Sequence, residues 1–382
     1  MGTLRFILAL SVAYGHAGDF LGFPLIPGDT AVQCFYAISG FYMALVLNEK
    51  YRPGSSTYSL FISNRFLRLF PIYATVLCFT LLLAIALSAL SKNELPFVSQ
   101  WQSFDRSSLA SLAFFVVSQV VMWGQELYVF LAVKNGSFVF SPDFHIAAQP
   151  VFMLAPIPQA WTLGLEFSFY LLAPFIVRRS AAFIAAVLAA SLALRLFLQF
   201  GFGLSGDPWS YRFFPSELAV FLVGALGYHV YRLRSIAFDR SVLSVFAVAI
   251  LCVGGALLVN RWHGLSRVAS VSFLILTFAA IPFLFRATNK NALDRALGEL
   301  SYPIYICHIL VIWFVDCVTA FYSGLVRGAV IITVTIIFSG ALYWLIDRPV
   351  DGWRQRRFVT KRSEGMRLPG TGVDQLKATS RS

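Results

Sequence analysis

The chain has 382 residues, of which 58% are hydrophobic and only 13% are charged, with a net charge of +12. A soluble domain carries about 25% charged residues, so the composition excludes an ordinary soluble protein and indicates an all-α polytopic membrane protein. The positive charge gathers in short loops between apolar runs, which leaves no domain that could bind nucleic acid.

Apolar runs along the chain predict about ten membrane spans, because a helical span needs about 20 apolar residues. A further apolar run, residues 109–133, is ambiguous. The predicted spans are residues 4–23, 30–47, 69–90, 160–177, 181–200, 214–231, 241–259, 268–285, 302–320 and 328–346.

Basic clusters between the spans predict the orientation, since such loops favour the cytoplasmic side. All of them lie there if the amino terminus is cytoplasmic and residues 91–159 cross an even number of times. Residues 109–133 therefore form a re-entrant or interfacial helix, or cross with an unidentified partner. We predict that both termini lie on the cytoplasmic side of the membrane. The clusters are Lys50/Arg52/Arg65/Arg68, Arg178/Arg179, Arg232/Arg234 and Arg286/Lys290/Arg295.

The remaining global features favour one membrane domain. Residues 1–350 are predicted to form it, and residues 351–382 a basic, disordered cytoplasmic tail. The first apolar run lacks a clear small-residue cleavage site, so we interpret it as a retained span. The five cysteines lie inside apolar runs without a pairing pattern, which predicts packed free thiols and no metal site.

Arg5 and His16 lie eleven residues apart in the first span, which is almost three helical turns, about 16 Å, on nearly one face. Ionisable groups inside spans are costly and are therefore functional candidates. Asp19 follows His16 by three residues and could orient it. The alternative is that Arg5 is an orientation signal and His16 satisfies a core hydrogen bond.

Arg65 and Arg68 share a helix face at the predicted cytoplasmic end of the third span. Two guanidinium groups at this spacing could clamp a phosphate. The alternative interpretation is a plain basic flank that signals orientation.

Glu166 is a carboxylate in the stretch WTLGLEFSFYLLAP, with Tyr170 one turn further along the same face. It could accept a proton or orient an imidazole. A helix-terminal residue favoured by the helix dipole is the alternative. Trp161, which opens the stretch, is a further candidate. His308 lies in the span that begins at residue 302, where a histidine is more often a hydrogen-bond partner between helices than a catalyst.

Six stretches together resemble the acyltransferase 3 family of bacterial integral-membrane acyltransferases, over about residues 3–350. They are the Arg-x10-His of Arg5 and His16, FYAISGFYMAL at 35–45, the Arg-x-x-Arg of Arg65 and Arg68, WTLGLEFSFYLLAP at 161–174, ELSYPIYICHILVI at 299–312 and DRP at 347–349. The chain departs from the family's WSLSVEEQFYL, because Phe167 replaces the second acid and Ser168 the glutamine. These departures leave the acceptor harder to infer.

The resemblance implies ten spans in the inner membrane of a bacterial cell. It also implies transfer of an acyl group, commonly acetyl, from a coenzyme A (CoA) thioester, which acts as a substrate and is not bound permanently. The acceptor would be a hydroxyl of a surface glycan or lipid-linked sugar. Arg5, Arg65 and Arg68 would meet the anionic part of the donor. His16 would take the acceptor's proton or briefly hold the acyl group.

The resemblance also gives Ser39 and Gly40 of the second span a place around the donor tunnel, where small residues let helices approach closely. A transporter or flippase is the competing function, since it would also line a pathway with arginine, histidine and glutamate. Inverted repeats would favour a transporter, and none is visible in the sequence. A membrane acyltransferase of unrelated fold is a third possibility.

Overall fold

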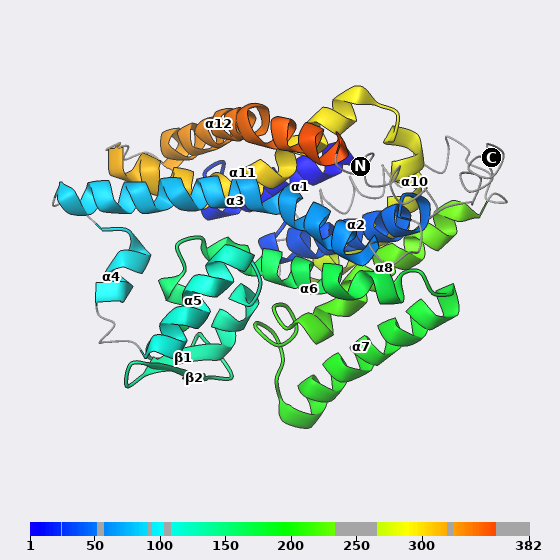
Figure 1. Ribbon diagram of the computed structural model, residues 1–382, viewed down its shortest axis with the longest axis horizontal. Coiled ribbons are helices and arrows are strands. Elements are labelled where there is room, and N and C mark those ends of the chain that lie inside the picture. The colour runs from blue at the N-terminus through cyan, green and yellow to red at the C-terminus, as the bar shows by residue number, and fades with distance from the viewer. Residues whose placement is uncertain are drawn as a thin grey trace, which may run out of the picture.

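Helices dominate the computed structural model, which describes residues 1–23, 25–51, 57–90, 94–102, 108–233, 266–318 and 324–356 (Figure 1). The α-helices are α1 (Gly2–His16), α2 (Gly28–Glu49), α3 (Thr57–Ala89), α4 (Pro96–Gln102), α5 (Leu109–Val121), α6 (Trp161–Ile176), α7 (Ala181–Phe202), α8 (Phe214–Arg232), α10 (Ser266–Thr288), α11 (Ala292–Val318) and α12 (Gly324–Leu342). The short elements are the 3-10 helices η1 (Gln125–Phe130), η2 (Val151–Leu154) and η3 (Pro158–Ala160), the π-helical turn η4 (Tyr343–Asp347), and the strands β1 (Leu131–Lys134) and β2 (Ser137–Phe140).

Six of the described helices are long and apolar enough to cross a membrane: α2, α3, α7, α10, α11, and α12 with its continuation to Arg356. Each corresponds to one of the ten predicted spans. Predicted spans 4–23 and 160–177 correspond to α1 and α6, whose 15 and 16 residues fall short of the about 20 that a bilayer requires. Span 214–231 corresponds to α8, which is not among the six, and span 241–259 lies outside the described residues. The structure therefore supports a multi-pass membrane protein and does not confirm the count of ten.

The first helix ends at His16, seven residues before the end of the predicted span. Gly18 and Asp19 have φ angles of +100° and +47°, which a right-handed helix cannot contain. Asp19 therefore lies in a turn after the helix. The helical spacing on which its predicted reach to His16 rested therefore does not apply, and the role of Asp19 in orienting His16 stays a prediction.

Residues 109–133 do not form one long helix. They divide into α5 with 13 residues, η1, and most of strand β1. At 1.5 Å per residue α5 spans about 20 Å, which is shorter than the about 30 Å of a hydrocarbon core. This geometry fits the non-crossing alternative. One face of α5 is apolar and exposed, and it carries Leu109, Leu112, Val116, Val117 and Val120.

Strands β1 and β2 form an antiparallel hairpin that the all-α prediction missed. Its turn is Asn135-Gly136, with φ angles of +50° and +72°. An Asn-Gly pair with two positive φ angles is the favoured two-residue connection between antiparallel strands. The sequence signal was therefore present, although the surrounding apolar run obscured it.

The last described helix continues past the predicted domain boundary at residue 350, since residues 351–356 are helical. Arg354 donates hydrogen bonds to the Asp351 side chain and to the Asn64 carbonyl, which joins this segment to α3. The prediction that the tail is disordered from residue 351 is therefore wrong for its first six residues. Residues 357–382 lie outside the described part.

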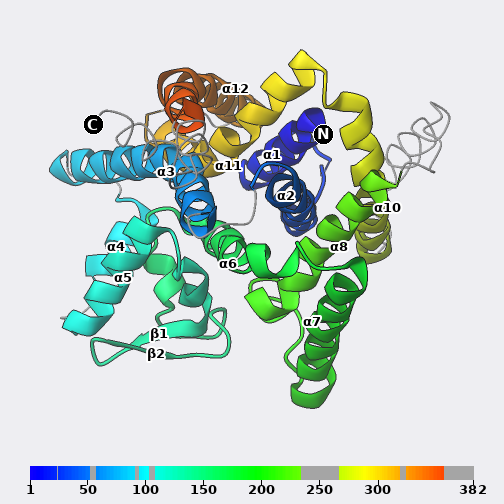
Figure 2. The same ribbon diagram turned by 45° about the vertical axis from the view of Figure 1, so that its right-hand side comes forward.

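Helices α1 and α2 lie in the middle, with α3, α6, α8, α10 and α11 around them, while α7 extends outward (Figure 2). Helix α1 runs parallel to α11, because Thr3 contacts Asp294 at one end and the His16 ring lies 5.0 Å from the His308 ring at the other. Helix α2 packs closely along α8. A Cβ on Gly40 would lie only 1.8 Å from the Phe221 carbonyl oxygen, so glycine permits this approach.

The periphery is suited to lipid. Only 11% of the apolar stretch of α7 is buried inside the protein. Its exposed side chains include Phe183, Leu192, Leu196, Phe197 and Phe200. The buried core lies around α1 and α2, where the polar side chains described next are held.

Candidate functional site

A cavity of about 750 Å³ opens among α1, α2, α3, α6, α11 and η4, and every one of the six sequence stretches singled out above contributes to its wall. Elements more than 300 residues apart in the chain therefore meet at one place. The residues from these stretches include Arg5; Phe35, Tyr36, Ser39, Tyr42 and Met43; Arg65 and Arg68; Thr162, Glu166 and Tyr170; Glu299, Tyr302 and Tyr305; and Asp347 and Arg348.

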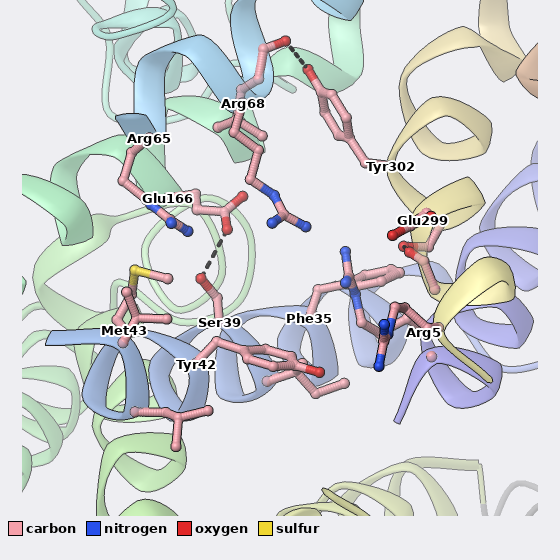
Figure 3. A pocket seen from close by; sticks show the side chains of 18 of the residues that line it. Arg5, Phe35, Ser39, Tyr42, Met43, Arg65, Arg68, Glu166, Glu299 and Tyr302 are labelled. Carbon is pink, nitrogen blue, oxygen red and sulfur yellow. Dashed lines mark hydrogen bonds between the residues drawn. The ribbon is translucent and has the colours of Figure 1, made fainter. Parts of the chain in front are cut away.

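Three arginines give one part of this cavity its positive charge. Arg65 and Arg68 project from one face of α3, as their spacing predicts, and Arg5 projects from α1 (Figure 3). Arg65 is only 9% exposed, and its Nε has no hydrogen-bond partner among the described residues. No described carboxylate forms an ion pair with any of the three. A buried guanidinium without a counter-ion favours an anionic ligand.

The acidic side chains near the arginines are largely engaged elsewhere. Asp351 pairs with Arg354, and Glu299 accepts a hydrogen bond from Tyr343. Glu166 is the carboxylate that lies between the side chains of Arg65 and Arg68 in Figure 3. The positive charge of this part of the cavity is therefore only partly balanced.

Glu166 is held by two neutral donors. Ser39 Oγ of α2 donates to Glu166 Oε1 at 2.8 Å, and the Tyr170 hydroxyl, one turn along α6, donates to the same oxygen. These bonds fit the placement of Tyr170 one turn along the same face of α6, and they give Ser39 a direct contact in the cavity wall. The role of Glu166 in accepting a proton or orienting an imidazole stays a prediction.

Gly40 does not line the cavity, although it was predicted at the donor site with Ser39. It faces α8, on a neighbouring side of α2. The close helix approach predicted for this pair is confirmed, and Gly40 acts through it. Ser39 contacts the cavity because it lies one residue, about 100°, around the helix.

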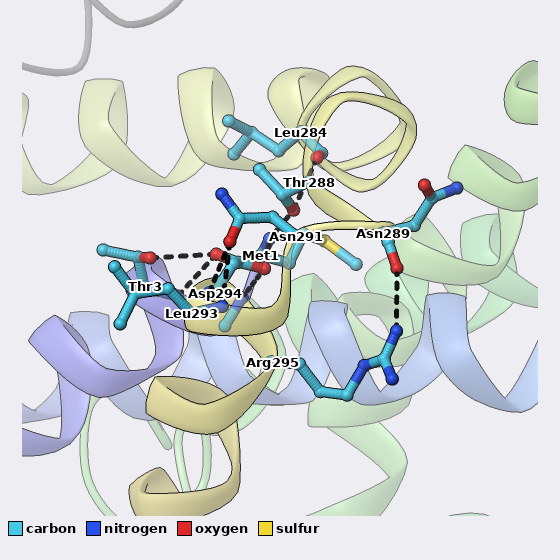
Figure 4. Close-up of polar contacts among 10 residues, drawn as sticks. Met1, Thr3, Leu284, Thr288, Asn289, Asn291, Leu293, Asp294 and Arg295 are labelled. Carbon is cyan, nitrogen blue, oxygen red and sulfur yellow. Dashed lines mark hydrogen bonds and ion pairs between the residues drawn. The ribbon is translucent and has the colours of Figure 1, made fainter.

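The start of α1 is fixed by Asp294 of α11 (Figure 4). Its carboxylate accepts hydrogen bonds from Gly2 N at 2.9 Å, Thr3 N at 2.8 Å and Thr3 Oγ at 2.9 Å. A carboxylate at a helix N-terminus satisfies free N–H groups and complements the helix dipole. Arg5 follows within the first turns, so Asp294 positions it, a role that sequence reasoning missed.

His16 lies at the other end of α1, outside the cavity wall, and it is exposed. Its Nδ1 lies 2.9 Å from the Val12 carbonyl oxygen. His308 of α11 is fully buried, and its Nδ1 lies 2.7 Å from the Tyr305 carbonyl oxygen. Because a carbonyl only accepts, we assign the proton of each neutral ring to Nδ1, which leaves Nε2 as a base.

The two histidines therefore form a pair of potential bases whose ring centroids are 5.0 Å apart. His308 Nε2 is buried without a hydrogen-bond partner among the described residues. Tyr305 joins the pair to the cavity, since it lines the wall and its ring lies 5.9 Å from the His308 ring. The histidines thus lie directly beyond one end of the cavity, and Arg5 lies about 16 Å from His16 along α1.

Trp161 is buried outside the cavity wall. The guanidinium of Arg212 lies 4.4 Å from its ring centroid and also forms an ion pair with Asp207. Trp161 therefore anchors the loop between α7 and α8 through a cation–π contact, and not the cavity itself.

Two buried carboxylates were not anticipated. Glu217 of α8 accepts a hydrogen bond from Gln33 at 2.9 Å and lies 3.6 Å from Arg195, and the rule applied to the other ionisable residues in spans would have found it. Glu126 of η1, outside the six candidate spans, accepts hydrogen bonds from Gly124 N and Ser168 Oγ. Burial raises the pKa of Glu126 to about 7. No group of described residues has the composition and geometry of a metal site.

Comparison with known proteins identifies the family. Residues 2–344 match its acyltransferase domain, which covers nearly the whole chain. The chain belongs to the acyltransferase 3 family. The resemblance drawn from the six stretches is therefore confirmed.

Two curated relatives are similar to parts of the chain. "Protein 2 in picA locus" of Rhizobium radiobacter is 35% identical over 74 residues, which are 19% of this chain and 39% of that protein. An "Uncharacterized protein" of Aquifex aeolicus (strain VF5) is 21% identical over 197 residues, which are 50% of this chain and 84% of that protein. The match thus spans well under half of the Rhizobium protein. No solved structure matches the chain.

Proposed function

We propose that this acyltransferase moves an acetyl group from acetyl-CoA to a hydroxyl of a surface polysaccharide or lipid-linked sugar. The observation that carries the proposal is the order of cationic and basic groups along the site. Three guanidinium groups that form no ion pair with any described residue line the cavity, and two imidazole bases lie next to Tyr305. An extended donor with an anionic head and a reactive thioester tail matches this order of groups.

The anionic end of the donor would bind to Arg5, Arg65 and Arg68. Guanidinium groups form bidentate, charge-assisted hydrogen bonds with phosphate, which suits the diphosphate of CoA. The pantetheine arm would extend along the cavity past Ser39 and Glu166 toward Tyr305. The thioester would then lie near the imidazoles.

His16 would act as the general base. Its Nε2 would take the proton of the acceptor hydroxyl as the oxygen attacks the thioester carbonyl, and would return it to the departing thiolate. His16 is exposed, so an acceptor can reach it, whereas His308 is buried behind it. Transient transfer of the acyl group to His16 is the alternative route.

We further propose that both termini face the cytoplasm and that the protein lies in the bacterial inner membrane. The start of α1 contacts Asp294, next to Lys290 of the α10–α11 connection and Arg295 in the first turn of α11. Basic connections favour the cytoplasmic side, where CoA is available. This orientation places the exposed His16 toward the outer side.

The test compares the surface glycans of a deletion strain and its parent by mass. Loss of a mass corresponding to one acetyl group per acceptor unit supports the proposal. The purified full-length protein in lipid nanodiscs should also transfer label from acetyl-CoA to that glycan. Identical glycan masses in both strains together with no CoA binding would contradict it.

A further inference from the structure

The hydroxyl group of Tyr36 is buried in the cavity wall without a partner. Tyr36 lies on the face of α2 that lines the cavity, it is 3% exposed, and its Oη has no hydrogen bond to any described residue. Its ring stacks on Phe221 at 4.5 Å with an interplanar angle of 25°, which fixes its direction. A buried hydroxyl without a partner costs free energy, so its presence indicates a ligand that satisfies it.

The position of Tyr36 along α2 separates it from the arginines. It lies three residues before Ser39, about 4.5 Å along the helix axis and on the side away from Lys50. The cavity wall also includes Thr162 and Tyr305, and Tyr305 leads to His308. The Tyr36 hydroxyl therefore lies in the part of the cavity where a thioester would be placed, and not where phosphates would bind.

The surroundings of Tyr36 keep its hydroxyl a hydrogen-bond donor. No described side chain accepts a hydrogen bond from it, so the hydroxyl is available as a donor. A neutral phenol with no other acceptor is preorganised to donate to an incoming oxygen.

We propose that Tyr36 is a further catalytic residue, whose hydroxyl donates a hydrogen bond to the carbonyl oxygen of the bound acyl group. The inference rests on the proposed function. As the acceptor oxygen bonds to the carbonyl carbon, its proton passes to His16 and the carbonyl π electrons move to oxygen. Tyr36 stabilises this oxyanion. When the C=O bond forms again, the C–S bond breaks and the thiolate takes the proton from His16.

The variant Tyr36→Phe removes only the hydroxyl and leaves the ring on Phe221. Removal of one oxyanion donor lowers kcat by about 10²–10³-fold, and we expect a loss in this range with little change in melting temperature. Tyr128→Phe is the matched control. Tyr128 is buried outside the cavity and bonded to Ser118 and Gln119, so its variant should lose stability and keep its kcat.

Binding of two non-reactive analogues separates a catalytic role from packing. A ketone analogue of acetyl-CoA, with a methylene group in place of sulfur, keeps the carbonyl oxygen, whereas S-ethyl-CoA lacks it. Tyr36→Phe should weaken binding of the ketone roughly 3- to 10-fold, as expected for one neutral hydrogen bond, and leave binding of S-ethyl-CoA unchanged.

Three outcomes are decisive. If the wild-type protein neither turns over acetyl-CoA nor binds the analogues, the proposed function fails. If the wild type is active and Tyr36→Phe keeps its kcat, only the role of Tyr36 fails. An equal loss of affinity for both analogues would likewise overturn that role, since it would show that the hydroxyl supports packing.

Discussion

Replacement of Arg65 and Arg68 by alanine tests the donor end of the cavity. Both side chains reach into the cavity without a described ion-pair partner, so each is free to bind phosphate. One hydrogen bond to a charged group contributes about 1.5–3 kcal/mol, which corresponds to a roughly 10- to 150-fold loss of CoA affinity for each single variant. Lysine should restore only part of the loss, because it keeps the charge and lacks the planar fork.

The assay is calorimetric titration of the protein in nanodiscs with CoA and with pantetheine, which has no phosphate. The arginine variants should lose affinity for CoA and keep their affinity for pantetheine. Arg179→Ala is the matched control, since Arg179 is exposed and outside the cavity. Unchanged CoA affinity in the double variant, or an equal loss of affinity for pantetheine, would refute phosphate binding by both residues and favour the alternative that they signal membrane orientation.

Three further predictions address other parts of the structure. His16→Ala should abolish acetyl transfer and preserve CoA binding, because the base lies beyond the donor cavity. His145→Ala, between β2 and η2, should keep nearly wild-type activity, and substantial activity in His16→Ala would refute the role of His16 as a base. Asp294→Ala should raise the KM for acetyl-CoA more than it lowers kcat, because the start of α1, and with it Arg5, loses its anchor. Asp294→Asn should recover part of the lost affinity. Equal KM values for Asp294→Ala and the wild type would refute the anchoring role. The raised pKa of Glu126 means that the folded protein keeps this proton between about pH 4.5 and 7, whereas the unfolded chain releases it, so folding becomes less favourable as the pH rises through that range. The melting temperature of Glu126→Gln should therefore exceed that of the wild type by more at pH 8 than at pH 5. A difference that does not change with pH would contradict the raised pKa.

The sequence identified the charged part of the cavity wall because its evidence was chemical. Arg5 and Glu166 were found as ionisable groups in apolar segments, and Arg65 and Arg68 as two guanidinium groups on one helix face. The structure brings these four together. Tyr170 was found by helical spacing, which holds inside a regular helix such as α6. Local rules were therefore sufficient where a residue and its partner share one element.

The remaining features depend on contacts that no local rule contains. The anchoring of α1 by Asp294 joins residues about 290 positions apart, and the histidine pair exists only because α1 and α11 run parallel. Asp19 was expected on the helix that carries His16, because that helix was predicted to continue to residue 23. Gly18 and Asp19 have positive φ angles, so the helix ends at His16. The hairpin was missed because the apolar run around Asn135-Gly136 was read as one segment.

The contact between α2 and α8 limits how this enzyme could be altered. Gly40 and Gly224 each face a backbone carbonyl of the other helix, at Phe221 and Ala37, with no room for a methyl group. The wall that carries Ser39 and Tyr36 therefore has a rigid support behind it and cannot retreat to admit a bulkier donor. Engineering for longer acyl chains would have to shorten lining side chains such as Phe35 or Met43, one by one, while the spacing of the two helices stays as it is.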